Sequence, residues 1–295
     1  MGAAGLITIE RVTTNIGAVI GGLDLREPLA AEAVAAVRRA LVEHGVVFFR
    51  GPTLTDEQFW AFTAQFGIPL KDETSGTEQN RASDLMTTDF APARHATAVW
   101  HADTTSLAAP PWATVLRAVR PTAFGGDTCW SSMYAAWEAL SGPMRRMLDG
   151  LTAVHSIQPT FDRMLNYAAG FEAQYLPRHA REQVHPVVLT HPETGRKALY
   201  VSESFTTRIV ELSPAESAAM LAMLFRHIER PDFCMRWKWS ADDIAFWDNR
   251  CVQHYAVPDY ERDRIMQRIC LQGGAPTGGL PPAAAARAPA LEEGS

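Results

Sequence analysis

Three short apolar runs near the end of the chain decide the fold: FCMRWKW at residues 233–239, IAFW at 244–247 and RIMQRICL at 264–271. Runs of this length, rich in aromatic and branched residues and separated by polar segments, predict β-strands. Similar runs occur upstream at 46–49, 114–119, 126–130, 187–190 and 198–201, the last two on either side of the turn sequence PETG at 192–195. Many short strands in one chain favour a sandwich or barrel.

Only a few helices are predicted between these strands. Residues 30–44 carry apolar side chains at helical spacing and end at Gly45, which favours a left-handed cap. Capping boxes begin two more helices, one at Thr55 and one at Ser213. No glycine-rich nucleotide fingerprint follows a strand, which disfavours alternating βαβ units. We therefore expect a mainly β fold with flanking helices, a double-stranded β-helix of the jelly-roll, cupin-like barrel type.

Two stretches without periodicity are expected to be loop insertions, one near 68–99 and one near 157–182. Loops of this length usually have a function, and the second has the character of a lid. Residues 274–295 are rich in Ala and Pro and are predicted to form a flexible tail. The remaining residues, 1–273, are predicted to form a single domain.

The composition points to small-molecule chemistry. The 295 residues are 47% hydrophobic and 20% charged, as in ordinary globular proteins, and the formal net charge of -6 provides no attraction to nucleic acid or to an anionic membrane. The four cysteines show no metal-binding or disulfide spacing, and neither an export signal nor a long apolar run is recognisable. We expect a cytoplasmic protein with reduced thiols, and a homo-oligomer is possible.

The sequence Trp100-His101-Ala102-Asp103 places an imidazole and a carboxylate two residues apart. In a strand both side chains would project from one face, so both could bind one metal ion. A third candidate ligand, His254, follows a predicted apolar strand. Although a lone H-x-D pattern is weak, two imidazoles and one carboxylate leave open coordination positions, as non-haem iron oxygenases require.

A second group of residues indicates a bound anion. Arg264 and Arg268 alternate with apolar residues and can face the interior of a barrel, where a guanidinium needs an anionic partner. A dicarboxylate with a 2-oxo acid end would supply one, because its far carboxylate accepts paired hydrogen bonds from Arg264. Thr128, after Gly125-Gly126-Asp127, offers a hydroxyl to the same carboxylate.

From about Ile7 to Gly273 the chain resembles the taurine dioxygenase family of iron(II)- and 2-oxoglutarate-dependent oxygenases. The shared motifs are WHxD, GGDT, SFTTRI, WDNR, QHY and the RIMxR segment. The resemblance implies that iron(II) is held by His101, Asp103 and His254, and that O2 is the oxidant. It also implies that Thr128 and Arg264 anchor 2-oxoglutarate, and that Arg268 corresponds to an arginine that meets the sulfonate in taurine-specific members.

The pattern departs from that family where the substrate is recognised. Members that oxidise sulfonates and sulfate esters carry a histidine shortly after a Phe-Gly pair, but residues 66–71 read FGIPLK. Thr97 stands where taurine oxidisers place an asparagine, so taurine itself is not the expected substrate. Phe205 matches an aromatic residue near the family's substrate pocket.

The expected reaction is hydroxylation, with desaturation as a variant, of a small and moderately hydrophobic carboxylic acid while 2-oxoglutarate becomes succinate and CO2. Three alternative substrates remain open. One is a natural-product acid, for example a terpenoid acid; the second is a sulfonate; the third is an alkyl sulfate ester.

Other interpretations remain open for individual residues and for the whole site. Trp100, Trp247 and Phe205 can be core residues, and Arg268 can form a structural ion pair with an acid such as Asp248. A barrel that binds a metal or an acid without turnover is an alternative of another class. A zinc-dependent hydrolase could use the same three ligands, but it would have no necessary role for an arginine and threonine that anchor a dicarboxylate.

Overall fold

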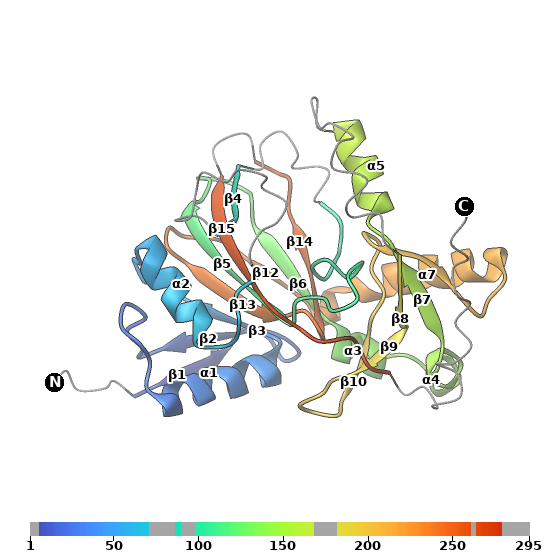
Figure 1. Ribbon diagram of the computed structural model, residues 1–295, viewed down its shortest axis with the longest axis horizontal. Helices are drawn as coiled ribbons and strands as arrows, with labels where there is room; N and C mark the ends of the chain where they lie inside the picture. Colours follow the sequence, from blue (N-terminus) through green and yellow to red (C-terminus); the bar gives the residue numbers. More distant parts are fainter. Residues whose placement is uncertain (1–5, 71–85, 90–97, 168–181, 261–263, 279–295) are drawn as a thin grey trace, which may run out of the picture.

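A computed structural model describes residues 6–70, 86–89, 98–167, 182–260 and 264–278. Its largest element is a seven-stranded sheet in which only the pairing of β2 with β3 is parallel. In spatial order the strands are β1 (Thr8–Arg11), β2 (Ala18–Gly21), β3 (Val46–Phe49), β13 (Ile244–Asp248), β5 (Ala113–Arg120), β15 (Ile265–Leu271) and β4 (Met86–Asp89) (Figure 1).

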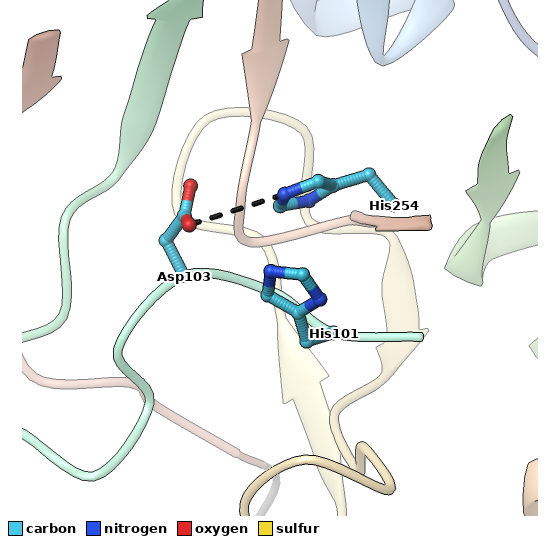
Figure 2. A group of neighbouring side chains, drawn as sticks. All are labelled: His101, Asp103 and His254. Carbon is cyan, nitrogen blue, oxygen red and sulfur yellow. Dashed lines mark ion pairs between the residues drawn. The ribbon is translucent and has the colours of Figure 1, made fainter. Parts of the chain in front are cut away.

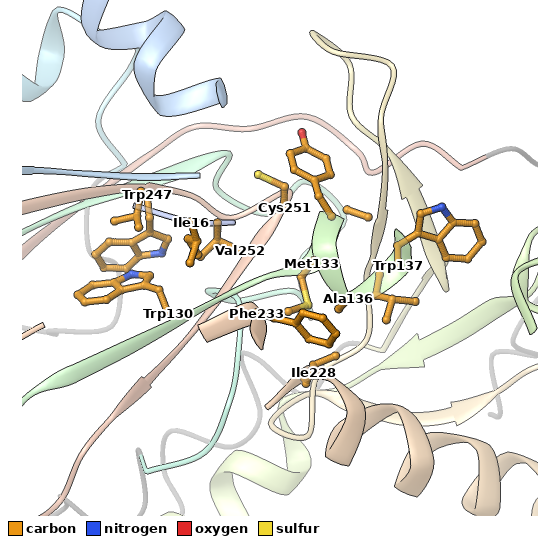
Figure 3. Packing of buried hydrophobic residues seen from close by; sticks show 14 of the residues in the cluster. Ile16, Trp130, Met133, Ala136, Trp137, Ile228, Phe233, Trp247, Cys251 and Val252 are labelled. Carbon is orange, nitrogen blue, oxygen red and sulfur yellow. The ribbon is translucent and has the colours of Figure 1, made fainter. Parts of the chain in front are cut away.

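A three-stranded sheet faces the larger one and completes a jelly-roll architecture of two sheets. Its order is β12 (Cys234–Trp237), β6 (Thr128–Ser132) and β14 (Val252–Ala256). Aromatic residues fill the space between the sheets, since the ring of Phe48 stacks on Trp237 with centroids 3.9 Å apart and meets Trp130 edge-on at 5.2 Å. Trp130 also meets Trp247 at 5.9 Å (Figure 3). The mainly β, jelly-roll prediction is confirmed, although in the described residues the two sheets do not join into one closed barrel.

Two helices cover the outer face of the large sheet, α1 (Ala31–His44) and α2 (Asp56–Ala64). Helix α1 ends at Gly45, whose φ of 73° is the left-handed conformation that the sequence predicted. The capping box at Thr55 is present, and α2 ends a turn before Gly67. Both predicted helices are therefore confirmed.

The remaining elements lie beside the two-sheet core in Figure 1. A third sheet has the order β11-β7-β8, and β9 and β10 form the predicted hairpin around residues 192–195. The strands are β7 (Thr152–His155), β8 (Gln183–Pro186), β9 (Val188–Thr190), β10 (Lys197–Leu199) and β11 (Thr206–Ile209). The helices in this part of the molecule are α3 (Met133–Glu138), α4 (Gly142–Leu148), α5 (Gln158–Tyr167), α7 (Pro214–Ile228) and the 3-10 helix η2 (Pro231–Phe233).

The described parts of the two predicted loop insertions each contain a short element. Helix α5 occupies the start of the 157–182 stretch, and Pro159 lies in its first turn, where a missing N–H costs no hydrogen bond. Strand β4 lies inside the 68–99 stretch and adds four residues to the edge of β15. Such a short polar strand has no periodicity of its own to reveal it. The rest of both stretches lies outside the described residues.

The end of the chain is described only as far as Gly278, which bridges to Leu189. The first residues of the predicted tail therefore contact the β9–β10 hairpin, and residues 279–295 lie outside the described part of the chain. Among the described residues, no helix has the length and apolar character needed to cross a bilayer.

Candidate metal centre

His101 and His254 are held side by side by a reciprocal pair of backbone hydrogen bonds. The N–H of His101 donates to the carbonyl of His254 at 3.0 Å, and the N–H of His254 donates back at 2.8 Å. His254 follows the apolar strand β13, as predicted, and itself lies on the next strand, β14. Of the H-x-D sequence only His101 has strand-like pairing. Asp103 begins a turn, so the turn, not strand alternation, directs its carboxylate toward the two imidazoles (Figure 2).

The three side chains can share one metal ion. One ligand atom from each lies within 4.8 Å of the other two, and Nε2 of His254 is 4.0 Å from Oδ1 of Asp103. Nδ1 of His101 is 2.7 Å from the carbonyl oxygen of Val99, so Nδ1 carries the proton and Nε2 keeps a lone pair for a metal. Because metal–ligand bonds are roughly 2 Å long, small side-chain shifts bring all three atoms onto one ion. The donor set and the tautomer both fit iron(II).

Burial and charge give these groups the protonation states that metal ligands need. Burial opposes ionisation of Asp103, but Arg268 and the two imidazoles outweigh it and hold the pKa of this carboxyl at about 2. Burial lowers the pKa of His254 to about 3 and also lowers that of His101. At neutral pH the site therefore presents one carboxylate and two neutral imidazoles.

A hydrogen-bond network that the sequence did not reveal fixes Asp103. Thr114 donates its hydroxyl to Oδ2 of Asp103 at 2.7 Å, and Oδ1 of Asn249 accepts the N–H of Asp103 at 3.2 Å. Asn249 in turn donates to Thr114 at 2.9 Å and accepts from Nε1 of Trp247 at 2.9 Å. With Oδ2 fixed in this way, Oδ1 faces the imidazoles. The WDNR motif pointed to Asn249 without a role, and nothing local marked Thr114.

Arg264 and Thr128, the two residues predicted to anchor an anion, contact each other in the interior. Arg264 is 2% exposed, and its Nη2 donates to Oγ1 of Thr128 at 3.3 Å. Nε1 of Trp239 donates to the same oxygen at 3.0 Å. On β6, Thr128 lies two residues from Trp130, which pairs with His254 on β14. That offset is about 7 Å along the strand, a distance that a five-carbon dicarboxylate can span.

Arg268 and Phe205 also lie at the centre, and Thr97 lies outside the described residues. Nη1 of Arg268 is 2.8 Å from Oδ1 of Asp103. Arg268 therefore forms the ion pair with an acid that the alternative interpretation expected, but its partner is Asp103, because Asp248 is bound by Arg250 and His191. Phe205 is buried, with its ring centroid 6.4 Å from that of His101, so it is both a core residue and a neighbour of the site.

A second group of potential ligands, His191, Asp248 and Cys251, is also close together. Nε2 of His191 is 3.0 Å from Oδ2 of Asp248, and its Nδ1 accepts backbone N–H groups of the hairpin turn. Arg250 holds the same carboxylate, and burial raises the pKa of the Cys251 thiol. These hydrogen bonds already satisfy the group, which therefore docks the β9–β10 hairpin onto β13.

Known proteins are similar to this chain over nearly its whole length. The model of the taurine catabolism dioxygenase TauD, TfdA family matches residues 8–270. An alpha-ketoglutarate-dependent sulfate ester dioxygenase of Pseudomonas putida is 38% identical over 92% of this chain and 91% of its own length. An alkylsulfatase of Acinetobacter baylyi is 34% identical over 92% of this chain and 87% of its own length.

A solved structure agrees with these sequence relatives. The crystal structure of a taurine dioxygenase from Burkholderia xenovorans superimposes with a TM-score of 0.77 at 39% identity, and the match covers 92% of this chain and 93% of that one. Together with the donor set at the centre, these similarities identify the class of enzyme. The chain belongs to the taurine catabolism dioxygenase TauD, TfdA family and is a non-haem iron, 2-oxoglutarate-dependent dioxygenase.

Proposed function

We propose that this dioxygenase oxidises an alkyl sulfate ester, with His101, Asp103 and His254 as its iron ligands. The observation that carries the proposal is the presence of two guanidiniums, buried Arg264 and half-buried Arg268, near a centre made of neutral imidazoles and one carboxylate. One cation suits the cosubstrate and the other suits an anionic substrate. Similarity to a sulfate ester dioxygenase and an alkylsulfatase supports a sulfate as that anion.

Arg264 and Thr128 are proposed to bind the far carboxylate of 2-oxoglutarate. The Thr128 hydroxyl oxygen already accepts two N–H groups, so its own proton is directed to a further acceptor. Arg264 adds a charge-assisted hydrogen bond in a buried setting, where such bonds are strong. The pair therefore fixes the cosubstrate at the distance from the metal ligands that the β6–β14 register sets.

Arg268 is proposed to bind the anionic head of the substrate while its contact with Asp103 keeps that carboxyl ionised. Phe205 offers an apolar surface beside His101 for the alkyl chain. Iron bound at the centre supplies oxygen activation for attack on an unactivated C–H bond. The protein groups place the carbon next to the ester oxygen toward the metal and exclude other reactions.

The overall chemistry balances without another reactant. One atom of O2 enters succinate as 2-oxoglutarate loses CO2, and the other enters the C–H bond next to the ester oxygen. The hydroxylated ester then breaks its C–O bond to give an aldehyde and hydrogen sulfate. Sulfate release should therefore equal succinate formation.

The decisive experiment compares hexyl sulfate with heptanoate, which carries the carboxylate favoured by the sequence alone. Protein with iron(II), 2-oxoglutarate and O2 is expected to form succinate and sulfate in equal amounts with hexyl sulfate, and far less succinate with heptanoate. If heptanoate stimulates succinate formation and hexyl sulfate does not, the substrate is a carboxylic acid and not a sulfate ester. Failure of both compounds to stimulate succinate formation would contradict the proposed substrate.

A further inference from the structure

Helix α5 is anchored to the turn that carries Phe205. Thr160 donates its hydroxyl to the carbonyl of Ser204 at 3.0 Å. Nη2 of Arg163 donates to the hydroxyl of Ser204 at 3.0 Å and to that of Thr160 at 3.2 Å. Ser204 is buried and directly precedes Phe205, whose ring lies beside His101. Arg163 is thus one residue removed from an aromatic side chain of the metal centre.

Arg163 and Arg268 approach the candidate ligands from different elements of the fold. Nη1 of Arg268 on β15 is 2.8 Å from Oδ1 of Asp103. Arg163 on α5 is bonded to Ser204, whose neighbour Phe205 has its ring centroid 6.4 Å from that of His101. Two cations placed this near to one small site favour an anion there.

Arg163 has hydrogen-bonding capacity left over. Its Nε is buried, and no described residue supplies an acceptor for it. Burial lowers the pKa of Arg163, and the nearby carboxylates of Glu203 and Asp162 offset this lowering only in part. In the described part of the chain no carboxylate lies within 4.0 Å of the Arg163 guanidinium. Arg268, by contrast, is paired with Asp103. Because buried N–H groups in proteins are nearly always hydrogen-bonded, the Nε of Arg163 calls for an acceptor from outside these residues.

We propose that Arg163 binds the anionic head group of the substrate from the side of α5, together with Arg268 on β15. This inference rests on the proposed function for the identity of the anion. A sulfate ester has three terminal oxygens and can accept hydrogen bonds from two guanidiniums at once, whereas a carboxylate has two oxygens in one plane. Arg163 therefore determines specificity for a sulfate ester over a carboxylate. It also supplies a charged hydrogen-bond donor in a chain that lacks a histidine after Phe66-Gly67.

The first test measures an anion without requiring turnover. Protein loaded with Mn(II) and 2-oxoglutarate is titrated with inorganic sulfate by calorimetry, using wild type, R163Q, R163K and R208Q. Loss of a charged hydrogen bond predicts sulfate binding about 10- to 100-fold weaker in R163Q, with partial recovery in R163K. Arg208 is exposed on β11, so R208Q should bind as wild type does. Equal sulfate affinity in R163Q and wild type overturns the proposal.

The second test separates binding from anchoring of the turn. In steady-state assays with hexyl sulfate, R163Q should raise the KM for that ester about 10- to 100-fold, and should leave kcat and the KM for 2-oxoglutarate within about twofold. S204A removes the hydrogen-bond partner and keeps the charge, so its KM should stay near that of wild type. If S204A reproduces the R163Q defect, Arg163 only supports the turn, and the proposal is wrong.

Failure of the role proposed for Arg163 can be distinguished from failure of the proposed substrate. If hexyl sulfate does not stimulate succinate in wild type but sulfate binding still depends on Arg163, the substrate assignment fails and the anion site stands. If hexyl sulfate is oxidised equally well by wild type and R163Q, the substrate assignment stands and the role of Arg163 fails.

Discussion

Individual buried charges in this protein are matched to specific partners, and Asp248 shows how much stability depends on one of them. Burial raises the pKa of its carboxyl, but hydrogen bonds from Arg250 and His191 outweigh burial and hold it at about 2. Because the folded-state pKa is below the ordinary value of 3.8, ionised Asp248 stabilises the fold at pH values above about 4. The stabilisation is lost as pH falls toward 2.

This linkage predicts an acid-dependent difference between wild type and D248N. The shift corresponds to about 2 kcal/mol in total, of which about 1 kcal/mol is lost between pH 6 and pH 3. D248N should be less stable at pH 6 and should lack this part of the acid dependence when unfolding free energies are measured in urea. The exposed acid Glu138, changed in E138Q, serves as the control. Parallel loss of stability in wild type and D248N would contradict the assignment.

At the residue level the sequence predicted the candidate ligands but not what holds them. His101, Asp103 and His254 stand in recognisable motifs, so their side chains could be named before any coordinates. Thr114 and Arg163 could not, because their hydrogen bonds to Asp103, Asn249 and Ser204 are tertiary contacts. Such contacts have no local sequence pattern, and only the fold brings them together.

At the level of secondary-structure elements and their connections, the loop between β5 and β6 packs closely against Arg264, the proposed anchor of 2-oxoglutarate. Gly126 has a φ of 68°, and a Cβ placed there would lie 2.9 Å from Oγ1 of Thr122 and 3.1 Å from Cδ of Arg264. Its N–H donates to Oδ1 of Asp259 at 2.8 Å. A glycine is therefore required both by the backbone and by the close approach of Arg264.

G126A should affect the cosubstrate site as well as stability. The added methyl group presses on Arg264, so the KM for 2-oxoglutarate should rise several-fold, and backbone strain should cost about 1 kcal/mol or more of unfolding free energy. Gly195 has the same φ of 68° but open space around its Cβ position, so G195A should show the strain alone. An unchanged KM for 2-oxoglutarate in G126A would argue against Arg264 as the anchor.

Sequence patterns predicted elements where periodicity or capping was strong and missed them elsewhere. The helices starting after Ala30 and Thr55 have regular apolar faces, and both were predicted close to their observed bounds. Helix α5 was missed because its polar residues and Pro159 resemble a loop. Strand β4 was missed because pairing with the edge of β15 creates it, and pairing partners cannot be deduced from four residues.

Considered as a whole molecule, the protein brings together ligands from distant parts of the chain by packing one sheet on another. His254 lies on the small sheet, Arg268 lies on the large sheet, and Asp103 lies in the turn between them that both contact. The rings of Phe48, Trp130 and Trp237 hold the sheets together. The order of the strands within each sheet did not follow from the sequence, because strand order depends on contacts between distant segments.

The most direct test of the whole account is the absorption spectrum of the protein under anaerobic conditions with iron(II) and 2-oxoglutarate. Cosubstrate bound to iron at this centre is expected to give a weak visible charge-transfer band. D103A should lose the band and bind iron more than about 100-fold more weakly, because it removes a ligand and not merely a supporting contact. H227Q, which changes a histidine bonded to the Ala136 carbonyl on another face of the core, should retain the band. A band of full intensity in D103A would contradict the assignment of the metal centre.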